Sequence, residues 1–276
     1  MEVPHRRSEA IHGLSQRQHC SPISDTERSS KCFDLKLPSV RSSPLWTANT
    51  DILIRYDTFG TTLTSSKTYN IQSWSLSAGD LDELANTCLS CPPILLHVFR
   101  DVSRFSSESD SGRLSKQQCD YLLSVVWSFD VETWVSSLHK ISTSFDAVKR
   151  VHVGAAYKAA VSIYVTRATA PTSETILPLE SLVSDVLAHL SAIPPDDWFF
   201  KATCWPTFIA GAETNNSTRR NAVVERFKLG MVTLPWGYLS DAIALLDRVW
   251  AQRNGPGASM DWLAALKSSD TDCLIA

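Results

Sequence analysis

The sequence predicts an all-α protein, an array of antiparallel helices preceded by a disordered or irregular N-terminal segment. From about Leu81 onward, apolar residues return every three or four positions, which is the period of an α-helix. The same region has no credible strand pattern, so successive helices are expected to pack as antiparallel neighbours. Nine Trp and ten Phe supply large side chains for a packed core.

The N-terminal part of the chain differs in composition from the rest. Ser, Thr and small polar residues dominate there, and only Ile52, Ile54 and Tyr56 alternate with polar residues as in a short strand. A segment of this kind has too little apolar surface to bury in a core of its own. We therefore expect a low-order Ser/Thr-rich segment over residues 1–74 and a helical domain over residues 75–276.

Two short helices are expected next, each with a recognisable start. Ser90 is expected to cap a helix that has Pro92 or Pro93 in its first turn, where a missing N–H costs little. The apolar stripe of this helix is Leu95, Val98, Phe99 and Val102. Ser115 and Gln118 have the form of a capping box, in which each satisfies an unpaired N–H of the other. The second helix then carries the apolar face Leu122, Val125, Val126 and Phe129.

Longer helices are expected from about Phe145 to Arg167 and from Leu179 to Ile193. The stripe of the first is Val148, His152, Ala155, Ala156, Ala159 and Ile163. Its small Ala side chains permit the close approach of a neighbouring helix. The second has the cleanest amphipathic pattern in the chain, and Pro194-Pro195 stops it.

The segment from Trp198 to Ala212 is apolar nearly all round, so it is expected to be a central, buried helix. Pro206 inside it removes one backbone hydrogen bond and should kink it. A last helix should end at Asn254-Gly255-Pro256-Gly257. Its stripe is Leu239, Ile243, Leu246, Val249 and Trp250.

Charge and hydropathy argue against several functions. The formal net charge is −3 with Lys and Arg scattered, whereas a surface that holds nucleic acid needs a basic excess. There is no run of about 20 apolar residues for a membrane span and no apolar stretch of a signal peptide. Seven Cys at irregular spacings are therefore expected to be reduced thiols inside a cell.

No pattern of catalytic, cofactor-binding or metal-ligating residues is recognisable. Cys88-Leu-Ser-Cys91 lacks a second ligand pair, and we interpret it as two half-buried residues at a helix start. His152 is expected to be a hydrogen-bonded core residue rather than a ligand. Asp196-Asp197 are expected to serve as a helix cap and a first-turn acid, not as a catalytic pair.

One motif goes beyond a generic helical domain. The stretch Trp205-Pro-Thr-Phe-Ile-Ala-Gly-Ala-Glu213, with flanking segments over about residues 80–265, resembles the fungal-specific transcription factor domain. This is the helical regulatory region downstream of the binuclear zinc cluster in many fungal regulators. The signature positions, all expected to be structural, are Trp205, Pro206, Phe208, Ile209, Gly211, Glu213, Arg220, Trp250 and Trp262. Trp205 in particular is expected to be an anchor of the core.

The resemblance implies a nuclear regulator of transcription by RNA polymerase II, without enzymatic activity or membrane contact. Its partners would be proteins, either a second copy or related regulators, and a small effector is possible. Such a regulator would bind DNA only through a zinc cluster held by six Cys. Because only Cys20 and Cys32 precede residue 88, no cofactor is expected in this chain.

Two alternatives remain open from the sequence. The chain would be a DNA-free partner that forms dead-end heterodimers with full-length regulators, or a helical enzyme whose site has no recognisable motif. A polar site assembled in a concave pocket would favour the enzyme. A closed apolar cavity or an exposed apolar patch would favour the regulator.

Overall fold

Helices make up the regular structure of the residues that the computed structural model describes. These are residues 59, 62–63, 91–138, 144–169, 178–233, 237–254 and 261–268, all within the unit Ser43–Ala276. In this part of the chain the one β-type pairing is a single bridge between Leu114 and Thr169. The predicted all-α class is thereby confirmed. The strand considered at 52–56 lies outside the described residues.

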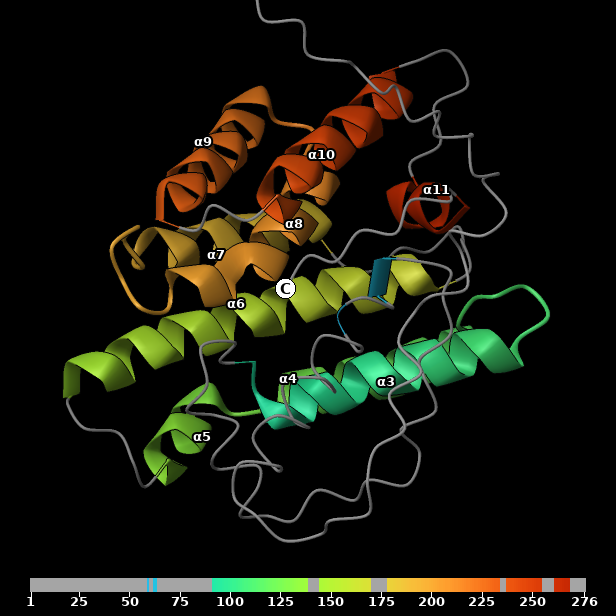
Figure 1. Ribbon diagram of the computed structural model, residues 1–276. Coiled ribbons are helices and arrows are strands. Elements are labelled where there is room, and N and C mark those ends of the chain that lie inside the picture. Colours follow the sequence, from blue (N-terminus) through green and yellow to red (C-terminus); the bar gives the residue numbers. More distant parts are fainter. Residues whose placement is uncertain are drawn as a thin grey trace, which may run out of the picture. The chain divides into compact units, whose positions relative to one another are not determined.

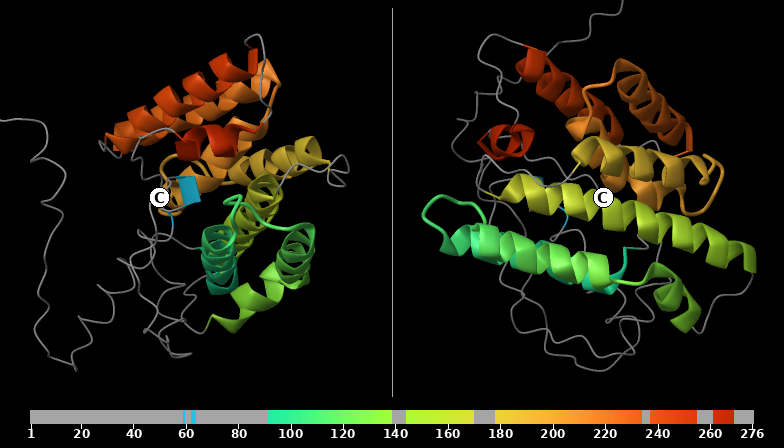
Figure 2. Two further views of the ribbon diagram at one scale, coloured as in Figure 1. Left: turned by 90° about the vertical axis from the view of Figure 1, so that its right-hand side faces the viewer. Right: turned by 180° about the vertical axis from the view of Figure 1, so that it is seen from behind.

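The long helix α6 (Ser144–Ala168) lies in the middle of the fold (Figures 1 and 2). It contacts α3 (Pro93–Glu108), α4 (Lys116–Ser128) and α5 (Val131–Ser137) on one side, and α7 (Leu179–Ser191) and α8 (Cys204–Glu213) on the other. Around α8, in turn, lie α7, α9 (Ser217–Thr233) and α10 (Tyr238–Asn254). The last described helix, α11 (Trp262–Ser268), packs on α10 and α6.

The helix starts follow from local chemistry, with one correction. The capping box of α4 is present, since Ser115 Oγ accepts from the Gln118 N–H and Gln118 Oε1 accepts from the Ser115 N–H. The prediction that Ser90 is the N-cap of α3 is wrong, because the N-cap residue is Pro92. Pro93 is the first helical residue, and its lack of an N–H leaves one group fewer to satisfy.

The stripes predicted for the longer helices are largely buried. Helix α6 spans the expected segment, but Val148 is 55% exposed and does not belong to its buried face. A close approach is present at Gly154, where an added Cβ would lie 2.7 Å from Val131 Cγ1 of α5. Helix α7 buries Leu179, Val183, Val186 and Leu190. Helix α10 ends at Asn254, where the sequence predicted an end.

The prediction of one helix from Trp198 to Ala212 is wrong at its N-terminal end. Trp198 is 57% exposed, and the chain passes through a 3₁₀ turn, η2 (Phe200–Thr203), before α8 begins at Cys204. Pro206 is therefore the third residue of α8. The N–H groups of a first turn have no partner within the helix, so the proline breaks no hydrogen bond there. For this reason the expected mid-helix kink is also wrong.

Candidate functional site

All ten residues of α8 are buried, and the two ends of this helix are fixed in different ways. At the N-terminal end, Trp205 is 0% exposed and stacks on Tyr157, with the ring planes 4° apart. The rings of Phe99 and Tyr164 meet it edge-on, with centroids 4.6 and 5.8 Å away. Aromatic pairs in these geometries add to the free energy gained by burying their surface.

Three residues from far upstream complete this aromatic cluster. Trp205 Nε1 donates to Thr62 Oγ1 at 3.0 Å, and Thr62 Oγ1 donates to the Phe59 carbonyl. Phe59 is fully buried and lies 6.0 Å from the Trp205 ring, and Leu63 is buried beside it. These contacts could not be predicted, because residues 1–74 show no helical period in their sequence. The boundary at 74/75 itself stays a prediction.

The C-terminal end of α8 is capped by side chains of α9 and α10. The last four carbonyls of a helix have no partner inside it, and when buried they need donors from elsewhere. The donors are Trp250 Nε1 to the Gly211 carbonyl (2.9 Å), Arg253 Nη1 to the Ala212 and Glu213 carbonyls (2.7 and 2.8 Å) and Arg220 Nε to the Thr214 carbonyl (3.2 Å). Cationic groups here also complement the negative end of the helix dipole.

The Glu213 side chain ties the same end to two further helices. Its carboxylate is buried and accepts from Arg167 Nε (2.7 Å) and Nη2 (2.5 Å) of α6, and from Trp262 Nε1 (2.9 Å) of α11. Burial lowers the pKa of Arg167, but the hydrogen bonds and charge of Glu213 outweigh it, so this pKa is raised overall. A charge-assisted bidentate pair of this kind fixes both the distance and the orientation of its partners.

The structure thus brings five of the nine signature residues together at one place: Gly211, Glu213, Arg220, Trp250 and Trp262. Gly211 belongs there because an added Cβ would lie 2.8 Å from Val223 Cγ1 and 3.1 Å from Leu246 Cδ1. Trp205, Pro206, Phe208 and Ile209 are buried along the rest of α8. The structural role of each signature residue stays a prediction.

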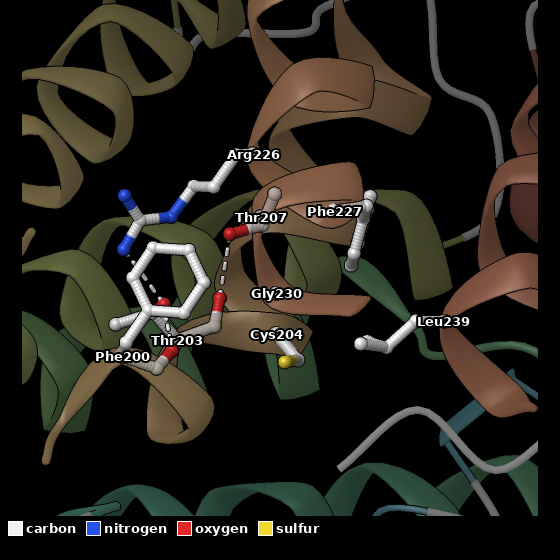
Figure 3. A pocket seen from close by; sticks show the side chains of 8 residues that line it. All are labelled: Phe200, Thr203, Cys204, Thr207, Arg226, Phe227, Gly230 and Leu239. Atoms are coloured by element: carbon white, nitrogen blue, oxygen red, sulfur yellow. Dashed lines mark hydrogen bonds between the residues drawn. The ribbon is translucent and has the colours of Figure 1, made fainter. Parts of the chain in front are cut away.

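A small pocket lies beside α8, between η2, α9 and α10 (Figure 3). Its lining is mostly apolar, and its free space of about 10 Å³ holds roughly one water molecule. Arg226 closes one side, with its guanidinium 4.2 Å from the Phe200 ring centroid and Nη2 donating to Thr203 Oγ1 at 2.9 Å. A pocket of this size has no room for a metabolite.

Two ionisable groups of this pocket have strongly shifted pKa values. Burial raises the pKa of the Cys204 thiol to about 11, so the neutral thiol form dominates at neutral pH. Burial lowers the pKa of Arg226 to about 10, which leaves it charged. Arg226 Nη1 donates to the Leu190 and Ile193 carbonyls at the end of α7. Neither residue has a sequence pattern that marks it as part of this pocket.

His152 and His189 form a pair between α6 and α7. Their Nδ1 atoms are 3.0 Å apart, which confirms the expected hydrogen bond of His152, but both rings are half-buried rather than in the core. Burial lowers the pKa of His189, and the neighbouring His152 lowers it further, whereas Asp185 raises it.

The remaining candidates from the sequence are Asp197 and the cysteine pair. Asp197 Oδ1 accepts from the Phe199 N–H at 2.8 Å and its carboxylate pairs with Lys149, so it caps the turn before η2. Cys91 is fully buried rather than half-buried, while Cys88 lies outside the described residues. Among the residues that the structure describes, no three His, Cys, Asp or Glu side chains are grouped to hold a metal ion. A groove of about 180 Å³ lies beside Lys201 and the exposed Trp198.

Comparison with known proteins identifies the class. The chain belongs to the family described as fungal specific transcription factor domain, whose model matches residues 21–276. It is similar to the acriflavine sensitivity control protein acr-2 of Neurospora crassa, at 30% identity over 261 residues. That alignment covers 84% of this chain and 43% of the relative, so the chain spans less than half of the relative's length. No solved structure matches.

The family assignment confirms the resemblance inferred from Trp205–Glu213, and places the chain among regulators of transcription. In the helices that the structure describes, none is long and apolar enough to cross a membrane.

Proposed function

We propose that this chain is the regulatory and interaction domain of a fungal regulator of RNA polymerase II transcription. It acts in the nucleus, through contacts with a second copy or a related regulator or through a small effector. It has no enzymatic activity of its own. The observation that carries the proposal is the family match over residues 21–276.

The use of the polar side chains supports a non-catalytic role. Arg220, Arg253 and Trp250 donate to backbone carbonyls, and Arg167 is engaged by Glu213. An enzyme instead directs such groups toward a space where a substrate can sit. The pocket beside α8 holds only about 10 Å³ and contains no such space.

DNA recognition in this proposal belongs to a module other than this chain. The formal net charge of −3 supplies no excess of cations to neutralise phosphates. The two Cys that precede residue 88 are fewer than the six that a binuclear cluster requires. Full-length relatives or partner proteins would provide that module.

A tethering experiment tests the proposal. The chain is fused to an unrelated DNA-binding domain and expressed in fungal cells with reporter genes that detect activation and repression. We expect reporter output to change relative to the DNA-binding domain alone, and the fusion to accumulate in nuclei. Trp205→Ala should abolish the effect by unfolding the domain, whereas the exposed Trp198→Ala should keep it. A folded, nuclear fusion without effect on either reporter would contradict the proposal.

A further inference from the structure

Only one of the three nitrogens of the Arg253 guanidinium makes hydrogen bonds. The residue is 8% exposed, and Nη1 makes both of its hydrogen bonds, to the Ala212 and Glu213 carbonyls. Nε and Nη2 are buried without a hydrogen-bond partner. Buried polar groups are nearly always paired, and a charged donor left alone is especially costly. These two N–H groups therefore call for a partner that the described residues do not supply.

The two free atoms have the geometry of an oxyanion receptor. Nε–H and the adjacent Nη2–H project side by side from one edge of the planar guanidinium, and this fork matches two oxygens of a carboxylate or phosphate. The neighbouring Arg167 shows the occupied form of the same arrangement. Its Nε and Nη2 donate to the two carboxylate oxygens of Glu213.

The carboxylates near Arg253 are already paired with other arginines. Burial lowers the pKa of Arg253. Glu213 opposes this shift, Arg167 and Arg220 add to it, and Glu180 opposes it. Glu213 is paired with Arg167, and Glu180 with Arg219. Asp261, which also faces Arg167, pairs with Arg113. Within the described part of the chain, Arg253 and Arg220 are thus left without a carboxylate of their own.

The end of a helix that carries free carbonyls ordinarily repels anions. At α8 this repulsion is reduced, because the terminal carbonyls already accept hydrogen bonds from Trp250, Arg253 and Arg220. The Arg220 guanidinium lies 5.1 Å from the Trp250 ring centroid and adds a second cation to the same surroundings. Arg220 and Arg253 thus bring two cations to this end of α8.

We propose that the Nε–Nη2 edge of Arg253 binds a small oxyanion, a carboxylate or phosphate group of a small molecule, at the C-terminal end of α8. Bound there, the anion satisfies two buried donors and links α10 to α8. The idea that this anion is an effector rests on the regulatory function proposed above. The binding of the anion to Arg253 does not depend on that function.

Thermal unfolding and calorimetric titration of the purified full chain test the site. The probes are sodium succinate and sodium phosphate, with sodium chloride holding the ionic strength constant. We expect at least one probe to raise the unfolding midpoint, by about 5–10 °C at roughly one hundred times its Kd. A response to succinate alone identifies a carboxylate as the ligand group, and a response to phosphate alone identifies a phosphate.

Two arginine variants separate this site from general charge effects. Arg253→Lys keeps the positive charge and a donor for the α8 carbonyls but lacks the fork, so affinity should fall at least about tenfold. Arg226→Lys is the matched control. Arg226 also donates to two carbonyls through Nη1, but its Nη2 already donates to Thr203, so only Nε of its edge is without a partner and the two-atom fork is not available. Affinity should survive in this variant.

If Arg253→Lys does not fold, the wild-type chain still decides the question. In ¹⁵N-labelled protein the Nε–H signal of Arg253 should shift as succinate or phosphate is added. An unmoved Arg253 signal, no midpoint shift with either probe, or full affinity in a folded Arg253→Lys variant would each overturn the proposal. All three readouts use purified protein and do not depend on the reporter experiment. Anion binding can therefore fail while the regulatory function is upheld, and the regulatory function can fail while anion binding is upheld.

Discussion

At the scale of single residues, Trp205 is the side chain around which the aromatic rings of α3 and α6 gather. We predict that Trp205→Ala costs roughly 3–5 kcal/mol of folding free energy, because it leaves a large cavity and removes the hydrogen bond that Trp205 Nε1 donates to Thr62 Oγ1. In a domain of this size each kcal/mol lowers the unfolding midpoint by roughly 2–4 °C. Trp198→Ala, at a residue 57% exposed, is the control and should cost less than about 0.5 kcal/mol. A midpoint shift below about 2 °C for Trp205→Ala would exclude the anchor role.

Gly211 gives a second prediction at this scale. The methyl group of Gly211→Ala would meet Val223 and Leu246, so α9 and α10 would have to move away from α8. Overpacking of this kind costs about 1–3 kcal/mol, although alanine alone would favour a helix. Gly237→Ala is the control, because nothing lies within 4 Å of its added Cβ. Chemical denaturation of both variants measures the difference, and equal unfolding free energies would contradict close packing at Gly211.

At the scale of helices, the elements predicted correctly are those with a local signal. The capping box at Ser115 and the stripe from Leu179 to Leu190 can be read from neighbouring residues alone. The start of α8 could not be predicted in this way, since the apolar run from Trp198 does not distinguish a buried 3₁₀ turn from an α-helix. Helix α9 was missed because it buries only Val223, Phe227 and Gly230.

The candidate site was predictable in its residues but not in its contacts. The resemblance marked Glu213, Trp250 and Trp262, yet their hydrogen bonds join positions 39 and 49 residues apart. Arg253 and Arg226 carry no sequence signal at all, since an arginine near a helix end is ordinarily a solvated residue. Only the fold shows that both reach buried carbonyls.

The contact between α6 and α7 gives a prediction about pH. In the His152–His189 pair one Nδ1 donates and the other accepts, so the pair cannot form when both rings are protonated. The folded-state pKa of His189 is lowered below the unfolded value of 6.5. Its contribution to stability is therefore complete above pH 6.5 and is lost as the pH falls through the folded pKa.

The matching experiment compares urea unfolding of the wild type and His189→Gln at pH 7.5 and 5.5. We expect the wild type to lose more stability between these conditions than the variant, whose amide does not titrate. The same loss in both proteins would show that the pair has no part in the pH dependence.

At the scale of the whole molecule, the extent of the folded unit can be tested by truncation. We predict that a fragment of residues 43–276 is more stable than one of residues 75–276, because the shorter one lacks Phe59, Thr62 and Leu63 of the core. Phe59→Ala in the longer fragment should reproduce part of the loss. Equal melting temperatures of the two fragments would instead support the boundary at 74/75 that composition predicts.

The whole chain also gives a prediction about zinc and DNA. A binuclear cluster requires six thiolates within a short segment, whereas the described cysteines Cys91, Cys119 and Cys204 are buried in separate parts of the fold. Only Cys20 and Cys32 remain before residue 88. We therefore expect metal analysis of the purified chain to find no stoichiometric zinc.

The net charge of the chain predicts weak binding to duplex DNA. Affinity for DNA grows with the number of phosphates that Lys and Arg neutralise, and each contact makes binding more sensitive to salt. This chain has 26 Lys and Arg against 29 Asp and Glu, and within the described residues Arg167, Arg220 and Arg253 are directed at α8 rather than at a surface. Fluorescence anisotropy with a labelled duplex should therefore show at most weak binding at physiological salt. Nanomolar, strongly salt-dependent binding, or two zinc ions per chain, would show that this chain itself contains the DNA-binding module.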